Sequence, residues 1–557
     1  MRIKKLIVIT SLSLCSLAGF AQQFTKADTL RGSITPERAW WDVMRYDIAV
    51  KPVYKTKYTS GYNEITYKVV QEEHPDVMQL DLQEPLVIDR ILFDDSTELT
   101  FRREGNVYWV ITEPQQLNSE HTVKVFFSGN PHVAVRPPWD GGWSFSEDKE
   151  GRPLMTVTCQ GLGASIWYPN KDHQSDEPDR GASLTMRVPG ELTAIANGRL
   201  LNKTEHKDGT TSYKWGVENP ISNYTLIPYI GHYENFKEVY PGVKGDLDLN
   251  YWVLDYNLDK AQDYMPKEVH SMLNAFEYWF GPYPFYEDGY KLIEVDNTGM
   301  EHQSAVSYGN YYAGGYRGRD GSGTGLGLTW DFIIIHESGH EWFGNNITTN
   351  DLADMYVHES FTNYSETLFI DYNYGPEAAN DYNYGIRQGI GNKTPIIPAY
   401  GVNAQGSGDM YPKGGNMLHS IRHSINNDPL FRNILAGLNQ TFHNQTVDGK
   451  QVQEYVSRKA GFDYSHVFQH YLTTTDIPTL QLYVDAEHHE IKYRYVNSLP
   501  EFNLPLSLVG TSEELKIYPV ANKWKSTPIT NKNQYLFTPA RIEYMYYLNV
   551  ELVTKLD

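Results

Sequence analysis

The alternation of apolar and polar positions divides the chain into three regions. From about residue 36 to residue 235, short segments alternate or run apolar between Gly, Asp and Pro breaks, as half-buried strands do. The clearest of these segments are residues 46–50, 63–70, 77–82 and 121–127. The pattern predicts an all-β N-terminal domain, which we place at residues 22–235.

The spacing of apolar residues becomes helical near Leu258. From Ala261 to Trp279 apolar side chains recur at helix spacing, and Gly281-Pro282 ends the run. Further helices are predicted around residues 331–345, 355–373, 414–426 and 428–440. These stretches are typical of a mainly helical domain, which we place at residues 236–475.

Strand patterning returns towards the end of the chain. It predicts strands at residues 480–484, 490–496, 514–518 and 542–550. Residues 476–557 are enough for a small C-terminal β-sandwich. We therefore expect a multidomain α+β protein, since 557 residues are too many for one hydrophobic core.

The first residues have the features of a secretory signal peptide. Basic residues (Arg2, Lys4, Lys5) precede a short apolar stretch at residues 6–17, and small residues up to Ala21 offer a cleavage site. We expect residues 1–21 to be removed on export, which leaves a periplasmic or secreted protein. No other stretch is long enough to span a membrane, so no membrane insertion is expected after removal.

Composition narrows the range of partners. The formal net charge of −21 argues against nucleic acids and anionic membranes as partners. Of the two cysteines, Cys15 lies in the predicted signal, so Cys159 has no partner for an intramolecular disulfide. No feature indicates assembly, and we expect a monomer or a weak oligomer.

Two short segments that begin with His-Glu predict a metal centre. His336 and His340 are four residues apart, which places both on one face of a helix. Glu337 lies near that face and can hold a metal-bound water. Glu359, on the next predicted helix, completes the two-His, one-carboxylate set of thermolysin-type zinc sites. We therefore predict one Zn²⁺ as cofactor, with Glu337 as the general base.

A glycine-rich segment lies just before the predicted zinc helix. Residues 314–327 hold seven Gly and lack the Gly-Lys-Ser/Thr of a phosphate-binding loop. A flexible connector and a mobile lid over the metal are both compatible with this composition.

With these segments the chain resembles the aminopeptidase N family of zinc metallopeptidases, which includes leukotriene hydrolase. Residues 336–345 are similar to the family's zinc helix with its Trp-Phe-Gly-Asn tail, and Glu359 follows at the family's spacing. The chain has His358 and Ser360 beside Glu359, where the family usually has Asn and Gly. We expect a structural role for His358. Glu366 would be either a partner of a ligand His or a surface carboxylate.

Residues 298–302 are similar to the family's Gly-x-Met-Glu-Asn motif, although Thr and His replace its first and last residues. The resemblance implies that Glu301 pairs with the free amine of the substrate. It also implies that Gly299 and Met300 contribute to substrate binding. Such an ion pair sets the distance from the chain end to the scissile bond, and so leads to removal of one residue at a time.

Two more segments resemble family motifs. Residues 411–415 are similar to the segment whose Tyr donates a hydrogen bond to the oxyanion, which implies this catalytic role for Tyr411. Residues 158–161 resemble an N-domain strand that reaches the active site. At the matching position Gln160 would help to bind the amine or the first side chain of the substrate.

The resemblance implies a zinc-dependent aminopeptidase acting on peptides with a free N-terminus. It also implies an N-terminal β saddle domain, a thermolysin-like catalytic domain and a small β-sandwich. Residues 476–557 are too few for the long C-terminal helical domain of many members, so we expect a more open site. Three alternatives stay open: a thermolysin-like endopeptidase, which would not need Glu301, an epoxide hydrolase, and a non-catalytic peptide-binding surface protein.

Overall fold

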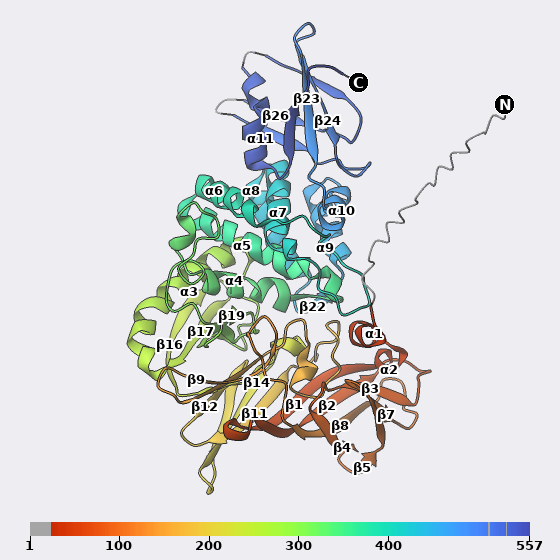
Figure 1. The fold of residues 1–557 in the computed structure, drawn as a ribbon, viewed down its shortest axis with the longest axis vertical. Helices are drawn as coiled ribbons and strands as arrows, with labels where there is room; N and C mark the ends of the chain where they lie inside the picture. The colour runs from red at the N-terminus through yellow and green to blue at the C-terminus, as the bar shows by residue number, and fades with distance from the viewer. Residues whose placement is uncertain (1–23, 511–512, 531, 557) are drawn as a thin grey trace, which may run out of the picture.

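The computed structural model describes residues 24–510, 513–530 and 532–556, and the predicted signal peptide lies outside them. Three regions follow one another along the long axis of the molecule (Figure 1). An N-terminal β region occupies one end, a helical region the middle, and a C-terminal β region the other end (Figure 1). The predicted multidomain α+β class is confirmed.

The N-terminal β region is built on an eight-stranded sheet in the order β13-β14-β11-β1-β2-β8-β4-β5. Its strands are β1 (Trp41–Val53), β2 (Tyr58–Val69), β4 (Val87–Phe93), β5 (Thr97–Leu99), β8 (Glu120–Gly129), β11 (Ala182–Pro189), β13 (Arg199–Glu205) and β14 (Thr210–Val217). Buried and partly exposed positions alternate along β2 and β8, as predicted for half-buried strands. Two short helices that the pattern did not predict, α1 (Lys26–Gly32) and α2 (Pro36–Ala39), precede the sheet.

Smaller sheets complete this region. One has the order β12-β15-β10-β9, and the other has the order β3-β7-β6. Their strands are β3 (Val77–Asp81), β6 (Phe101–Glu104), β7 (Val107–Ile111), β9 (Gly142–Glu147), β10 (Pro153–Thr158), β12 (Thr193–Ile195) and β15 (Tyr229–Gly231). β9 and β10 pair antiparallel with Gly142 opposite Thr158, so the chain entering β9 and the chain leaving β10 lie side by side.

The helical region contains a five-stranded sheet in the order β16-β17-β18-β20-β19, which leaves β19 at an edge. Its strands are β16 (Tyr233–Gly242), β17 (Gly245–Leu254), β18 (Tyr290–Glu294), β19 (Gly299–Met300) and β20 (Val306–Tyr308). The predicted domain boundary after residue 235 falls inside β16, because this strand pairs along its whole length with β17.

The long predicted helices of this region are present. They are α3 (Leu258–Phe280), α4 (Phe332–Gly339), α5 (Tyr356–Tyr374), α7 (Pro412–Ile425) and α8 (Asp428–Thr441). Three more helices were not predicted: α6 (Pro376–Ile386), α9 (Gly449–Ala460) and α10 (Ser465–Thr473). The prediction of one helix over residues 331–345 is wrong in its last part, because Phe343 and Gly344 leave helical backbone angles.

The C-terminal β region contains a four-stranded sheet in the order β27-β24-β23-β28 and the hairpin β25-β26. Its strands are β23 (Thr479–Asp485), β24 (Glu490–Val496), β25 (Leu506–Val509), β26 (Glu514–Ile517), β27 (Lys525–Pro528) and β28 (Asn549–Leu552). The predicted strand at residues 542–550 is wrong in its first half, where helix α11 (Pro539–Met545) forms. Pro539 opens this helix, and Ile542 and Tyr546, one turn apart, are both buried.

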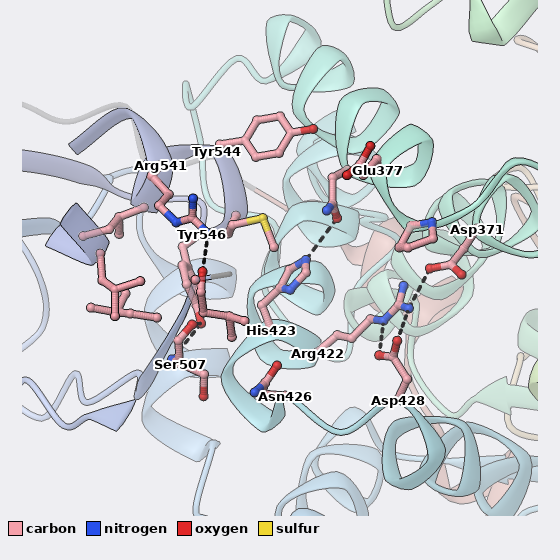
Figure 2. Close-up of a pocket in the computed structure, with 18 residues that line it drawn as sticks. Asp371, Glu377, Arg422, His423, Asn426, Asp428, Ser507, Arg541, Tyr544 and Tyr546 are labelled. Carbon is pink, nitrogen blue, oxygen red and sulfur yellow. Dashed lines mark hydrogen bonds and ion pairs between the residues drawn. The ribbon is translucent and has the colours of Figure 1, made fainter. Parts of the chain in front are cut away.

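A cavity of about 580 Å³ lies where the C-terminal β region meets α6 and α7 (Figure 2). The guanidinium of Arg422 lines it and pairs with Asp371 at 2.6 Å and with Asp428 at 2.8 Å (Figure 2). The amide of Tyr547 donates to Ser420 Oγ on α7 at 2.9 Å. The C-terminal β region is thus bonded to the helix that begins directly after Tyr411.

No helix in the described part of the chain combines the length and the apolar character that crossing a bilayer requires.

Helix α7 lies unusually close to α5, the helix that carries Glu359. A Cβ added at Gly414 would lie 1.9 Å from Ser360 Oγ and 2.5 Å from Ser360 Cβ. That hydroxyl donates to the Met410 carbonyl at 2.7 Å, so it cannot turn aside without losing this bond. Glycine at position 414 therefore permits the close packing of the two helices.

We expect Gly414→Ala to lower the free energy of unfolding by about 1–3 kcal/mol, because the added methyl overpacks the contact with Ser360. Urea titration followed by tryptophan fluorescence measures this change. Gly408→Ala is the matched control, since a Cβ there meets no atom within 4 Å. Equal stability of the two variants would show that α7 can move away from α5 without cost.

Candidate metal centre and active site

Helix α4 is held in the core on one side and faces a cavity on the other. The Asp331 side chain caps its first turn by accepting from the amide of Ile334 at 3.1 Å. The apolar run Ile333–Ile335 is buried and fixes the helix in the core. His336 and His340, one turn apart, are consequently directed towards the cavity together with Glu337.

His336, His340 and Glu359 form the metal-ligating group. One ligand atom from each lies within 4.8 Å of the others, and all three residues are buried. Glu359 Oε2 is 3.4 Å from His340 Nε2 and 4.0 Å from His336 Nε2. Ligands at zinc–ligand distances of about 2.0–2.2 Å in a tetrahedral site are about 3.3 Å apart, so this spacing fits a bound ion.

Two further observations fit a metal at this point. Glu359 Oε2 is buried and has no hydrogen-bond partner in the part of the chain that the structure describes, although a buried charge requires one. His336 Nδ1 lies 2.8 Å from Glu366 Oε1, and His340 Nδ1 lies 3.0 Å from the Phe343 carbonyl. With each Nδ1 donating to an oxygen, both Nε2 lone pairs are left for a metal.

Glu366 is a buried partner of a ligand rather than a surface carboxylate. Besides His336, it accepts from Asn363 Nδ2 at 3.1 Å and from the Tyr382 hydroxyl at 2.6 Å. These bonds orient the carboxylate that orients the imidazole. The alternative of a surface carboxylate is wrong, because α5 is covered on this side and Glu366 is 1% exposed.

His358 is directed away from the metal-ligating group. Its Nε2 accepts from the amide of Thr349 at 2.9 Å, and burial lowers its pKa to about 3. This neutral imidazole stabilises the turn before α5, in agreement with the structural role expected from its position next to Glu359.

The break after His340 depends on one glycine. Gly344 has φ +128°, which side-chain-bearing residues rarely adopt, and a Cβ there would lie 3.2 Å from His340 Nδ1. The reversal brings the Phe343 carbonyl back to that same imidazole nitrogen. The segment at residues 342–345 after the two His therefore includes the glycine that lets the Phe343 carbonyl bond to His340.

The cavity has a strongly negative potential. Burial opposes protonation of His340, yet the neighbouring carboxylates, Glu359 first among them, raise its pKa to about 10. Burial also raises the pKa of the Glu337 carboxyl to about 7. Both shifts indicate a site whose electrostatics favour a cation.

The N-terminal β region contributes the amide that joins this centre to Glu301. Gln160 Nε2 donates to Glu301 Oε1 at 2.7 Å and lies 3.2 Å from Glu359 Oε1. The Tyr224 hydroxyl donates to the same Glu301 oxygen at 3.0 Å. One amide side chain therefore spans from the proposed amine-binding carboxylate to a metal ligand. Tyr224 has no role in the sequence-based predictions, since only the fold brings it next to Glu301.

Gly299 and Met300 form the edge strand β19. A Cβ at Gly299 would lie 2.6 Å from Ile333 Cγ2 on α4, and its φ is +143°. Glycine is thus required for β19 to lie against the metal helix. The outer edge of the strand has no neighbour in the sheet, which leaves its backbone groups beside the cavity.

Tyr411 precedes α7 and lines the same cavity as β19. Its ring centroid is 6.0 Å from that of His336. Burial, reinforced by the carboxylates of Glu359 and Glu301, raises the pKa of the phenol well above 10. Tyr411 is consequently a protonated hydrogen-bond donor at neutral pH.

These residues line one cavity of about 460 Å³. Every predicted site residue is among them, although the roles of these residues stay predictions: Gln160, Gly299, Met300, Glu301, His336, Glu337, His340, Glu359 and Tyr411. Cavity-lining residues that sequence reasoning missed are Pro138, Trp139, Thr298, Tyr316, Phe332, Asn363 and Gln405. Tyr316 belongs to the glycine-rich segment at residues 314–327, so this segment reaches the cavity.

Helix α1 holds two loops that reach the cavity. Arg31 Nε donates to the Leu162 carbonyl at 3.2 Å, and the Asp28 carbonyl accepts from the amide of Asn403 at 3.0 Å. The loops carry two cavity-lining amide side chains: Gln160 and Gln405. The first helix of the chain is thus part of the support of the site.

The Peptidase family M1 domain matches residues 328–471, which contain α4, α5 and α7 and with them all three metal-ligating residues. Residues 328–471 are thus a peptidase family M1 domain. This confirms the resemblance to the aminopeptidase N family, which the zinc helix and the spacing of Glu359 indicated.

Among M1 relatives, endoplasmic reticulum aminopeptidase 1 of Mus musculus is 23% identical over 363 residues, 62% of this chain and 38% of that protein. Aminopeptidase N of Canis lupus familiaris is 26% identical over 289 residues, 50% of this chain and 28% of that protein. The chain therefore spans less than two fifths of the length of these relatives.

Solved M1 structures share the fold. An M1 zinc metallopeptidase from Deinococcus radiodurans has a TM-score of 0.65 at 20% identity and covers 79% of this chain and 94% of its own. Legionella pneumophila aminopeptidase A, in complex with aspartic acid, has a TM-score of 0.74 at 15% identity. The match covers 93% of this chain and 60% of the Legionella chain.

We expect Glu366→Gln to weaken zinc binding by about 10–100-fold, because the imidazole of His336 loses the carboxylate that orients it. Competition with a chelating dye measures the affinity. Glu377→Gln, an exposed carboxylate on α6, is the control and should bind zinc like the wild type. Wild-type affinity of Glu366→Gln would mean that the bond to His336 does not orient the ligand.

Proposed function

We propose that this M1 protein is a zinc-dependent aminopeptidase that hydrolyses the N-terminal residue from peptides. One observation carries the proposal: Gln160 reaches both Glu301, at 2.7 Å, and the metal ligand Glu359, at 3.2 Å. A carboxylate that binds the free amine is then one side chain away from the metal centre. With the amine held at Glu301, the bond at the metal is the first peptide bond.

The residues of the site divide the chemistry between them. Zinc held by His336, His340 and Glu359 would supply a Lewis acid that polarises the carbonyl and lowers the pKa of water. Glu337, which lines the cavity beside the metal-ligating group, takes a proton from the attacking water as general base. The water oxygen bonds to the carbonyl carbon, and Glu337 passes the proton to the leaving amine as the C–N bond breaks. Tyr411 donates a hydrogen bond to the oxyanion.

Glu301 and Gln160 position the substrate for this step. The carboxylate pairs with the ammonium group, while Tyr224 and Gln160 hold the carboxylate in place. The edge of β19 offers backbone groups to the peptide main chain. A Deinococcus radiodurans M1 zinc metallopeptidase of the same fold was solved with a Tyr-Ser-Ala substrate, which supports peptides as the substrate class.

We expect Glu337→Gln to lower kcat by about 10²–10⁴-fold on amino-acid 4-nitroanilides with a free amine, because the general base is lost. Zinc content, measured by metal analysis, should stay at the wild-type level, since Glu337 is not a ligand. The N-acetylated twins of the same substrates should not be cleaved by the wild type. Equal cleavage of blocked and free substrates would instead place the protein among thermolysin-like endopeptidases.

We expect Glu301→Gln to lower kcat/KM for free-amine substrates by about 30–1,000-fold, since a buried ion pair with the ammonium is lost. Tyr224→Phe removes only one hydrogen bond to that carboxylate, so the loss should be about 3–100-fold. Steady-state kinetics at neutral pH measures both. If Glu301→Gln kept wild-type kcat/KM, Glu301 would not bind the amine.

A further inference from the structure

Trp139 lies on the side of the cavity where Gln160 enters. The antiparallel pair β9-β10 ends with Gly142 opposite Thr158, so the residues before Gly142 run beside those after Thr158. A Cβ at Gly141 would lie 2.9 Å from Leu162 Cδ1, which places the two segments in contact. Trp139 and Gln160 both line the cavity. The indole therefore lies at the end where the substrate amine is bound.

The loop that carries Trp139 is held by its own hydrogen bonds. Asp140 accepts from the amide of Val135 at 2.6 Å and from the amide of Arg136 at 2.9 Å. The amide of Trp139 donates to the Arg136 carbonyl at 2.9 Å. The backbone that presents the indole is thus defined before any ligand is bound.

The indole itself is left largely in water. Trp139 is 73% exposed, whereas most tryptophans of the chain are buried. Its side chain forms no hydrogen bond and no ring contact with the part of the chain that the structure describes. The indole is a large apolar group at the wall of a cavity, and a ligand that covers it lowers the free energy by removing apolar surface from water.

The charged groups of the cavity already have roles in binding the metal, binding the amine or acting as the base. The carboxylates and imidazoles that line it are the metal-ligating group together with Glu301 and Glu337. No Lys or Arg of the described residues lines this cavity, so an acidic side chain would meet no counter-charge there. Besides Trp139, the lining includes the apolar side chains of Pro138 and Met300.

We infer that Trp139 determines the specificity for the first residue of the substrate and that the preferred peptides begin with a large apolar or aromatic side chain. The inference rests on the proposed aminopeptidase function. Because Glu301 and Gln160 hold the amine, the side chain of the same residue starts one bond from the carbon that bears that amine. It therefore extends along the wall that Trp139 and Pro138 form, where an aromatic ring can stack on the indole.

The test compares kcat/KM for Phe, Leu, Ala, Asp and Arg 4-nitroanilides. We expect the wild type to favour Phe and Leu, and Trp139→Ala to lower the ratio of Phe to Ala by about tenfold or more, mainly through KM. Trp139→Phe should restore most of the ratio. Val135→Ala is the matched control, since Val135 is exposed on the same loop and does not line the cavity.

Each other outcome has a defined meaning. An unchanged Phe-to-Ala ratio in Trp139→Ala, or an equal loss on all substrates, would overturn the role of Trp139 while leaving the aminopeptidase function in place. A wild-type preference for Asp or Arg would overturn the inferred substrate class. A wild type with zinc bound that cleaves no free-amine substrate would refute the proposed function, and this inference with it.

Discussion

Several carboxylates and two imidazoles share one buried cavity, and this concentration of charge is the constraint on which the rest of the structure depends. Buried carboxylates are costly unless a cation or hydrogen-bond donors compensate them. Glu301 has donors in Gln160 and Tyr224, whereas Glu359 Oε2 has none among the described residues. A metal ion on the two imidazoles and Glu359 would supply the missing charge. A cation is thus an electrostatic requirement of this cavity, and in the proposed function it is also the reactive centre.

The surrounding architecture holds these groups at fixed positions. Glu366 orients one ligand and the reversed backbone at Gly344 orients the other. Close packing of α7 on α5 through Gly414 keeps Tyr411 beside the ligand helix. The C-terminal β region, at the opposite end of the molecule from the N-terminal β region in Figure 1, is bonded to α7 and so supports the site. The contacts that stabilise the fold therefore also hold the proposed catalytic residues in place.

The N-terminal β region completes the site rather than only flanking it. Gln160 and Trp139 come from neighbouring ends of the β9-β10 pair, and both line the cavity built on α4 and α5. The metal centre can be built within the helical region alone, because its ligands come from two consecutive helices of that region. In the proposed aminopeptidase, recognition of the amine and of the first side chain needs both regions. Loops of the β region can thus set specificity while the metal centre stays the same.

The sequence predicted best where the structural reason is local. Long amphipathic helices such as α3 were predicted because their period is strong over many residues, but α6, α9 and α10 were missed. The start of α9 has a capping box, Asp448 with Gln451, that could have indicated it. Residues 542–550 were predicted as a strand, although short apolar runs are compatible with both the strand period and the helix period. Burial of Ile542 and Tyr546, one turn apart, favours the helix that forms there.

The sequence by itself determined the metal centre, because the i, i+4 spacing of His336 and His340 places two imidazoles on one helix face whatever the rest of the fold does. On the following helix, Glu359 and Glu366 are seven residues apart and so lie on one face. Glu359 supplies the third ligand, and Glu366 supplies the partner of His336. Only the tertiary structure decided that Gln160, Tyr224 and Glu301 meet, and that Trp139 stands at the amine end of the cavity. Their contacts join segments far apart in the chain, and side-chain spacing along a sequence carries no information about such distances.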